Sequence, residues 1–122
     1  MKKRAVLHLW DFWKQETEGI VVKKVYIAGP MTGLPEFNKP AFFAMEEELK
    51  RRGCIVMNPA ILPDGFEWEE YMHICIPMLA CCDTVVFLDG WQLSKGARLE
   101  YDKAVEMGKQ LVTKPLLESK VA

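Results

Sequence analysis

Short hydrophobic runs alternate with longer amphipathic stretches along most of this chain of 122 residues. Runs of four or five β-branched and aromatic residues are typical of buried parallel strands, and apolar residues spaced three and four apart are typical of helices. From residue 24 onward the pattern predicts the element order β-α-β-α-β-α-β, with Asn38 placed to cap the first helix. The expected strands are 25–28, 54–57, 84–88 and 110–113, and the expected helices are 39–52, 67–81 and 95–107.

This order predicts an α/β fold of the three-layer, Rossmann-like or flavodoxin-like kind, in which helices cover both faces of a parallel sheet. Right-handed crossovers leave few topologies, and we expect the strand order 2-1-3-4. The first and third strands then lie side by side, so the loops 29–33 and 89–96 that follow them meet at one edge of the sheet. Ligands bind at that edge in open α/β sheets, and the convergence therefore predicts a site there.

The first of these loops, Gly29 to Gly33, does not carry the G-x-G-x-x-G fingerprint of dinucleotide-binding folds. Its glycines nevertheless allow a ligand to approach the backbone closely. An ordinary Gly-Pro turn would explain the same residues, so the loop points to a site only because a second unusual loop is expected beside it.

The second loop leads into a helix with an unusual carboxylate. Ser94 is placed to cap this helix, and Glu100 shares its inner face with Ala97 and Ala104. Burial of an unpaired carboxylate is costly. Glu100 therefore either lies at the edge of the face and pairs with a nearby Lys or Arg, or it serves a function. A capped helix N-terminus offers amide groups to an anion, and an anion site beside a carboxylate favours the functional interpretation.

Residues 1–23 do not follow the alternating pattern and are expected to form an N-terminal extension of a single domain at 24–122. Within this extension, residues 5–10 could form an extra edge strand or pack on a partner, or the extension could be poorly ordered, as chain termini often are. The sequence leaves these alternatives open.

Composition narrows the classes of function. The 16 basic and 17 acidic residues give a net charge of −1, which argues against a general nucleic-acid or membrane-surface binder. No apolar run approaches the roughly 18 residues of a membrane span. The four cysteines form no C-x-x-C pair and are expected to be reduced, buried thiols of a cytoplasmic protein. The two histidines lack metal-site spacing, so we expect no metal.

The motifs YIAGPMTG at 26–33, NPA at 58–60 and CDTVVFLDGWQLSKGARLE at 82–100 together resemble the nucleoside 2-deoxyribosyltransferase-like superfamily. They are most similar to an uncharacterised bacterial and phage branch, related to 2′-deoxynucleoside 5′-monophosphate N-glycosidases. The resemblance covers about residues 24–112. It implies an enzyme that cleaves the N-glycosidic bond of a nucleoside or nucleotide by hydrolysis or base transfer. It also implies that no cofactor is needed and that the protein forms a homo-oligomer, a dimer or larger.

The resemblance also assigns roles to residues. Tyr26 matches a tyrosine of the first strand, and Glu100 matches the nucleophilic glutamate. Ser94 matches a phosphate-binding serine of the monophosphate hydrolases, where the base transferases carry an aspartate, and this favours a nucleotide substrate. Gly96 matches a glycine of the same loop. The first loop is expected to line the substrate through Gly29, Pro30 and Met31.

One position departs from the superfamily pattern. Cys75 stands where the characterised enzymes carry a catalytic aspartate, and a thiol cannot shuttle a proton as a carboxylate does at neutral pH. Either Asp89 supplies the second carboxylate, or the protein is slow or inactive. Cys75 itself could act as a nucleophile, but its apolar neighbours favour an unreactive buried thiol.

In the mechanism that these residues imply, loss of the base builds positive charge at C1′, as in glycoside hydrolysis. Glu100 attacks or stabilises C1′, Tyr26 holds its carboxylate, and Asp89 assists the sugar or the leaving base. Ser94 and the amides after it hold the 5′-phosphate, and Trp91 either stacks on the base or anchors its loop on the core. The alternatives are a nucleotide sensor without catalysis and a scaffold that assembles through its aromatic N-terminus.

Overall fold

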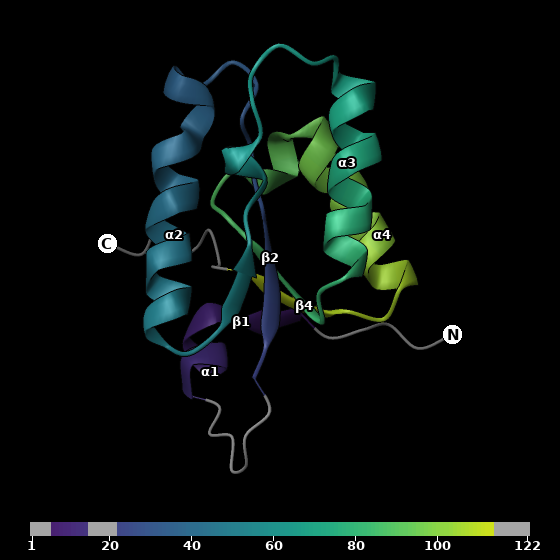
Figure 1. The fold of residues 1–122 in the computed structure, drawn as a ribbon. Helices are drawn as coiled ribbons and strands as arrows, with labels where there is room; N and C mark the ends of the chain where they lie inside the picture. Colours follow the sequence, from purple (N-terminus) through teal and green to yellow (C-terminus); the bar gives the residue numbers. More distant parts are fainter. Residues whose placement is uncertain (1–5, 15–21, 114–122) are drawn as a thin grey trace.

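Five strands form one parallel sheet in the computed structural model, which describes residues 6–14 and 22–113 (Figure 1). The order across the sheet is β1-β5-β4-β2-β3. The strands are β1 (Val6–His8), β2 (Lys24–Ala28), β3 (Ile55–Met57), β4 (Thr84–Phe87) and β5 (Gln110–Thr113). The predicted α/β class is confirmed, and the four predicted strands have the expected order 2-1-3-4, with one further strand beside them.

The further strand is β1, which pairs with β5 at the edge of the sheet, Val6 lying opposite Leu111. Of the alternatives for the N-terminal segment, an edge strand is therefore what the structure shows at Val6–His8. A short helix, α1 (Leu9–Lys14), follows it and was not predicted. The segment 15–21 and the tail 114–122 lie outside the described residues.

Helices cover both faces of the sheet (Figure 1). The long helices are α2 (Lys39–Arg51), α3 (Trp68–Ala80) and α4 (Lys95–Glu106), with α1 and α2 on one face and α3 and α4 on the other. Short 3₁₀ helices (Pro35–Asn38, Pro59–Ile61 and Trp91–Leu93) interrupt the loops that follow β2, β3 and β4. The predicted three layers are thus present.

Alternation along β2 distributes its side chains between two cores. Val25 and Ile27 belong to the cluster under α1 and α2, whereas Tyr26 and Ala28 belong to the cluster under α3 and α4. Successive side chains of a strand point to opposite faces, so this division follows from sequence position alone. It places Tyr26 on the same face of the sheet as the helix that carries Glu100.

The start of α2 differs from the prediction. Asn38 does occupy the N-cap position, but its side chain makes no capping hydrogen bond and its φ of 62° lies in the left-handed region. Its side-chain amide instead donates to the carbonyl oxygen of Pro30 at 2.9 Å. Asparagine tolerates the left-handed conformation better than most residues, and here it ties α2 to the loop after β2.

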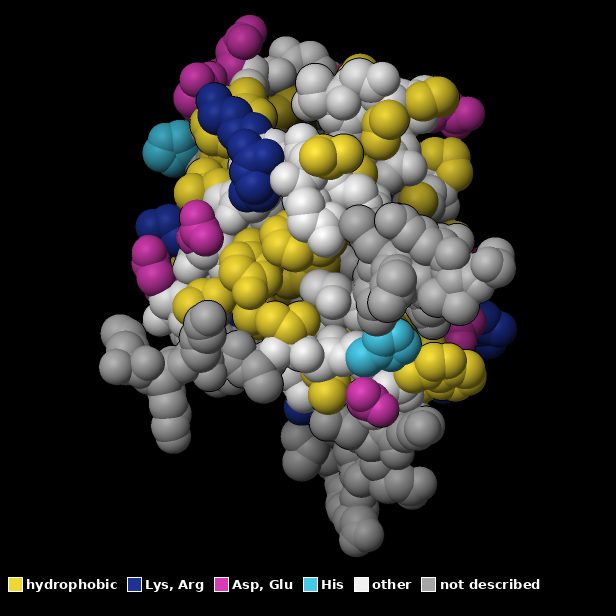
Figure 2. Space-filling model, turned by 180° about the vertical axis from the view of Figure 1, so that it is seen from behind, with side chains coloured by type: hydrophobic (Ala, Val, Ile, Leu, Met, Phe, Trp, Pro, Cys, Tyr) yellow, Lys and Arg dark blue, Asp and Glu magenta, His cyan; other side chains and the backbone are white. Residues whose placement is uncertain are grey.

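The surface shows mixed charges. On the face opposite to the view of Figure 1, basic and acidic side chains of the described residues are scattered around hydrophobic ones (Figure 2). This distribution agrees with the near balance of charges in the sequence. In the described parts of the chain, no helix has both the length and the apolar character needed to cross a membrane.

Candidate active site

The loops after β2 and β4 pack directly on each other, as the strand order predicts. A Cβ atom added to Gly29 would lie only 2.8 Å from Cβ of Leu88, and one added to Gly90 would lie 3.4 Å from Cγ of Pro30. Gly29 is therefore required by close packing between the two loops. This contact brings both predicted loops to the same edge of the sheet, where the carboxyl ends of β2 and β4 lie side by side.

Tyr26 and Glu100 meet in the core beneath this edge. The hydroxyl group of Tyr26 on β2 donates a hydrogen bond of 2.6 Å to Oε2 of Glu100 on α4. Tyr26 is 0% exposed and Glu100 is 5% exposed. The carboxylate therefore pairs with a tyrosine. The alternative to a functional role was an edge position with a Lys or Arg partner, and Glu100 has neither in the described residues. A short hydrogen bond to a buried carboxylate makes the pair a candidate catalytic centre.

Burial changes the titration of both groups. It raises the pKa of the Glu100 carboxyl from 4.5 to about 7, while the hydrogen bond from Tyr26 opposes the rise. Burial, followed by the neighbouring charge of Glu100, raises the pKa of Tyr26 well above its ordinary value of 10.0. Tyr26 therefore remains a hydrogen-bond donor at neutral pH, and Glu100 changes its charge in the physiological range. Such tuned carboxyl groups are frequent in active sites.

Cys75 on α3 belongs to the same group of side chains. Its thiol interacts with the hydroxyl of Tyr26 and with the charge of Glu100, and it is 4% exposed. Burial raises the pKa of this thiol to about 11. Cys75 is therefore protonated at neutral pH, which supports the interpretation of an unreactive thiol over that of a nucleophile.

The N-terminus of α4 has the predicted cap. Oγ of Ser94 accepts a hydrogen bond of 3.1 Å from the backbone N–H of Ala97. Gly96, in the first turn, lies close to α3, since an added Cβ would be 3.3 Å from Nε1 of Trp68 and 3.4 Å from Cε of Met72. Gly96 thus has a packing role. The amide groups at the start of this helix remain suited to an anion.

Trp91 anchors its loop on the core. Its ring stacks on Tyr101 with 4.9 Å between centroids and an interplanar angle of 13°, and it also contacts Phe87. Its indole N–H is buried and has no hydrogen-bond acceptor among the described residues. Buried donors are normally satisfied, so this one is available to a ligand or a water molecule. This packing agrees with the anchoring interpretation of Trp91, and stacking of its ring on a base stays a prediction.

Asp89 and Met31 lie toward the other face of the sheet. Asp89 is exposed and lines a hollow of about 350 Å³ together with Asn38 and Glu48. Met31 packs against the cluster under α1 and α2. The residues that the structure brings together in one buried group are thus Tyr26, Cys75 and Glu100, not Asp89 and Glu100.

The structure gives no sign of a metal site in the described residues, where no group of three His, Cys, Asp or Glu side chains is arranged to hold an ion. The four cysteines are free thiols, and Cys75 and Cys82 are buried. Cys81 is exposed and Cys54 half-buried, so the expectation of burial is wrong for Cys81.

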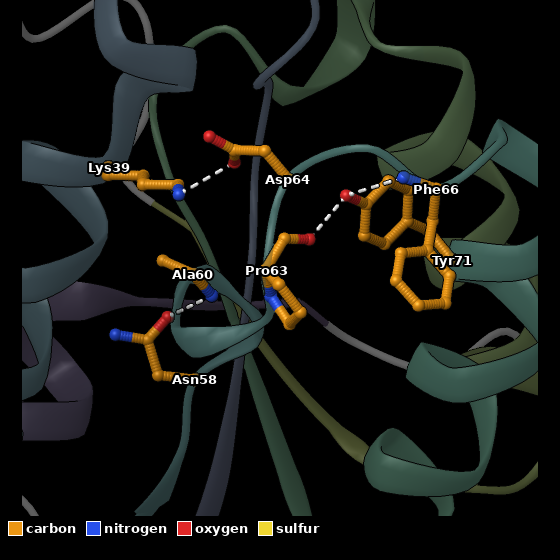
Figure 3. Close-up of polar contacts among 7 residues, drawn as sticks. All are labelled: Lys39, Asn58, Ala60, Pro63, Asp64, Phe66 and Tyr71. Carbon is orange, nitrogen blue, oxygen red and sulfur yellow. Dashed lines mark hydrogen bonds and ion pairs between the residues drawn. The ribbon is translucent and has the colours of Figure 1, made fainter.

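Sequence reasoning missed the importance of the loop between β3 and α3. The Asn58 side chain is buried and both donates and accepts hydrogen bonds. Its amide group donates to Glu46, and its oxygen accepts from the N–H of Ala60. The hydroxyl of Tyr71 donates to the carbonyl oxygen of Pro63 (Figure 3). The Asn-Pro dipeptide at the start of the loop signals a turn. The sequence around it does not reveal the contacts with Glu46 and Tyr71, which belong to other elements.

The comparisons with known proteins agree with this fold. A family model described as "Domain of unknown function (DUF4406)" matches residues 23–113. The search of curated proteins found no match. Among solved structures, the chain is similar to a 2-desoxiribosyltransferase from Leishmania mexicana, with a TM-score of 0.61 and 21% identity, covering 80% of this chain and 70% of that one. That likeness shows the shared fold. The family model spans most of the sequence, and the chain therefore belongs to the DUF4406 family.

Proposed function

We propose that this protein cleaves the N-glycosidic bond of a nucleoside 5′-monophosphate, with Glu100 as the nucleophile. The observation that carries the proposal is the buried hydrogen bond of 2.6 Å between Tyr26 and Glu100. A buried carboxylate beside a neutral donor is suited to attack on, or stabilisation of, a carbon that gains positive charge. The anomeric carbon of a nucleoside is such a carbon when the base departs.

In the proposed reaction, Glu100 attacks C1′ and the bond from C1′ to the base nitrogen breaks. The base leaves with the electron pair of that bond and takes up a proton from water, since Asp89 lies toward the other face of the sheet. A water molecule then attacks C1′ and releases the sugar phosphate, giving its proton to solvent or to the restored carboxylate. Attack by the nitrogen of a second base would complete a transfer instead.

The 5′-phosphate of the proposed substrate has a candidate binding site at the start of α4. The N-terminus of α4 begins with Ser94, six residues before Glu100 on the same helix, and its amide groups favour a phosphate. The buried indole N–H of Trp91 offers a further donor in the preceding loop. A nucleotide would then bridge the helix N-terminus and the buried carboxylate, with the backbone of Gly29 and Pro30 facing it.

The comparisons support the general class of activity. The similar solved structure is named as a 2-desoxiribosyltransferase, a name that describes transfer of a deoxyribosyl group. We extend that likeness to this chain as part of the proposal, together with a cytoplasmic location and a homo-oligomeric state.

A non-catalytic nucleotide sensor is the second candidate. The observation in its favour is Cys75, whose neutral thiol lies beside Tyr26 and Glu100 where a second acid or base would assist the chemistry. A sensor would use the same binding site and would need no proton transfer.

The test is release of free base from the four deoxynucleoside 5′-monophosphates, followed by chromatography. We expect release from at least one of them and its loss in Glu100→Gln, which keeps the shape of the side chain. The matched control is Glu106→Gln, which removes an exposed carboxylate from the same helix and should retain activity. Tight binding of a nucleotide without base release would favour the sensor. Absence of both binding and release would overturn both candidates.

A further inference from the structure

The candidate centre is closed in this structure. Tyr26 is 0% exposed, Cys75 4% and Glu100 5%. A carbon atom of a substrate must come within bonding distance of a carboxylate oxygen to react with it, and these side chains leave no such approach from solvent. Some part of the chain must therefore move before any ligand can reach Glu100.

The loop between β3 and α3, residues 58–67, connects two elements that lie next to this region. It leaves the carboxyl end of β3 beside β2, since Met57 lies opposite Tyr26 in the sheet, and it ends at the start of α3. Within it, Leu62 packs against the buried cluster that contains Tyr26 and Cys75. The loop therefore places an apolar side chain against the cluster to which both side-chain neighbours of Glu100, Tyr26 and Cys75, belong.

Two contacts near the protein surface hold the far part of the loop, one toward each neighbouring helix (Figure 3). On the α2 side, Nζ of Lys39 forms an ion pair of 2.8 Å with Asp64. On the α3 side, the hydroxyl of Tyr71 donates to the carbonyl oxygen of Pro63 at 2.6 Å and accepts from the N–H of Phe66 at 3.3 Å. Tyr71 lies one turn before Cys75 on the same face of α3.

These contacts are of the kind that break easily. Exposed ion pairs contribute little because water and salt compete with them. Gly65 has a φ of 106°, which other residues rarely adopt, and the absence of a Cβ atom lets its backbone change conformation beside the anchored residues. The base of the loop is firmer, because the buried Asn58 side chain is satisfied on both sides. The loop thus has a fixed base and a weakly held far part.

We propose that residues 61–66 form a lid that opens and closes over Glu100, with Leu62 as the covering side chain and with Lys39 and Tyr71 as its latches. The lid would open to admit a substrate and close to exclude water from the carboxylate. As a gate for a substrate it rests on the proposed function, but its opening can be measured without any enzymatic activity.

The Cys75 thiol is a built-in reporter of opening. We would expose the full chain to iodoacetamide and follow alkylation of each cysteine by peptide mass spectrometry. Cys82 is the internal control, because it is as buried as Cys75, at 5% exposed, and lies beyond the C-terminal end of α3. Burial raises the pKa of each thiol to about 11, so both are protonated at neutral pH. Lid opening exposes Cys75 alone, whereas global unfolding exposes both.

Three variants test the latches and the cover. Tyr71→Phe removes one hydroxyl, Lys39→Met removes one ion pair, and Leu62→Ala removes the covering side chain. Tyr71→Phe removes both hydrogen bonds of that hydroxyl. We expect it to speed alkylation of Cys75 by at least about two- to tenfold, the factor that corresponds to one hydrogen bond, and to leave Cys82 unchanged. The control is Lys103→Met, which removes the ion pair with Glu106 on α4, away from the loop.

Alkylation of Cys75 that is equally slow in all three variants would overturn the lid, and so would parallel acceleration of Cys75 and Cys82. Selective acceleration of Cys75 in a protein that releases no base would establish the lid and reject the proposed enzyme. Base release with no selective acceleration would establish the enzyme and reject the lid. The two proposals can therefore fail separately.

Discussion

Tyr26 and Glu100 share a hydrogen bond of 2.6 Å although they are 74 positions apart in the chain. The parallel pairing of β2 with β4 makes this contact possible, because it places the β2 tyrosine beneath the helix that follows β4. The bond keeps a carboxylate in the core that would otherwise be unpaired. It also means that each partner controls the titration of the other.

Removal of the Tyr26 hydroxyl should raise the pKa of Glu100. In Tyr26→Phe the pKa of Glu100 should rise above about 7, because the hydrogen bond that lowers it is lost. If Glu100 acts in its ionised form, the acid limb of the kcat/KM profile moves to higher pH and activity at pH 7 falls. The buried acceptor left without its partner should also lower stability by about 1–3 kcal/mol. Unchanged positions of the acid limb would contradict a role for the pair in catalysis.

Glu100 should make folding stability depend on pH in an unusual direction. Its folded pKa of about 7 lies above the ordinary value of 4.5, so the folded protein holds this proton more tightly than the unfolded chain. The contribution of this proton to the free energy of unfolding is fully present below about pH 4.5. It is lost as the pH rises to about 7, which lowers the free energy of unfolding by about 3 kcal/mol. Glu100→Gln cannot ionise, so its stability relative to the wild type should increase between these pH values.

Urea unfolding at several pH values between 4.5 and 8 measures this difference. Glu106→Gln, on the exposed side of the same helix, supplies the matched comparison and should follow the wild type. A stability difference between Glu100→Gln and wild type that stays constant over this range would show that Glu100 is not shifted upward.

Replacement of Cys75 should leave the chemistry in place. The thiol is neutral at neutral pH because burial raises its pKa to about 11, so it is a poor nucleophile. We expect Cys75→Ala to release base at about the wild-type rate while losing roughly 1 kcal/mol of stability from the small cavity. Mass spectrometry of trapped enzyme should find the sugar on the peptide that contains Glu100. Loss of activity in Cys75→Ala, with the sugar on Cys75 in wild type, would reverse the assignment.

Gly29 and Gly96 should differ in how well they tolerate replacement by alanine. Gly29→Ala would place Cβ 2.8 Å from Cβ of Leu88, an atom fixed to the backbone, and should cost about 1–3 kcal/mol. Gly96→Ala meets Met72 at 3.4 Å and Trp68 at 3.3 Å, and the methionine side chain can move aside. Alanine also suits a helix better than glycine by up to about 1 kcal/mol. Thermal unfolding should therefore show a larger loss for Gly29→Ala, and equal losses would contradict the packing argument.

The sequence predicted the parts of this structure that depend on local pattern. The buried run at 84–88, the cap at Ser94 and the face shared by Ala97 and Glu100 all follow from spacing, and all are present. The parts that it did not predict depend on contacts across the fold. Asn38 adopts a left-handed conformation and its side-chain amide bonds to Pro30 in the loop after β2, and no neighbour in sequence reveals this.

The same distinction explains the site. Glu100 was identified because a carboxylate on an inner helix face conflicts with the local pattern. The contacts of the β3–α3 loop were not identified, because its residues read as an ordinary turn between a strand and a helix. Only the fold shows that Leu62 packs against the cluster of Tyr26 and Cys75 and that Tyr71 bonds to Pro63, the contacts on which the proposed lid rests.

Ser94 can be tested for two roles with one pair of substitutions. Its hydroxyl caps α4 by accepting from the N–H of Ala97, and in the proposed function its side chain and the following amides hold a phosphate. Ser94→Ala removes the cap and should lower stability by about 0.5–2 kcal/mol. Ser94→Asp keeps a good cap, because a carboxylate accepts the same hydrogen bond and favours a helix N-terminus.

The aspartate, however, places a negative charge where the phosphate would bind. We therefore expect Ser94→Asp to be as stable as the wild type, to raise KM for a deoxynucleoside 5′-monophosphate strongly, and to leave the use of the uncharged nucleoside unchanged or improved. Ser94→Asn is the control, since it caps the helix without adding charge. If Ser94→Asp and Ser94→Asn use the monophosphate equally well, the phosphate does not bind at the start of α4. If only the aspartate variant discriminates against it, the helix N-terminus determines the choice between nucleotide and nucleoside.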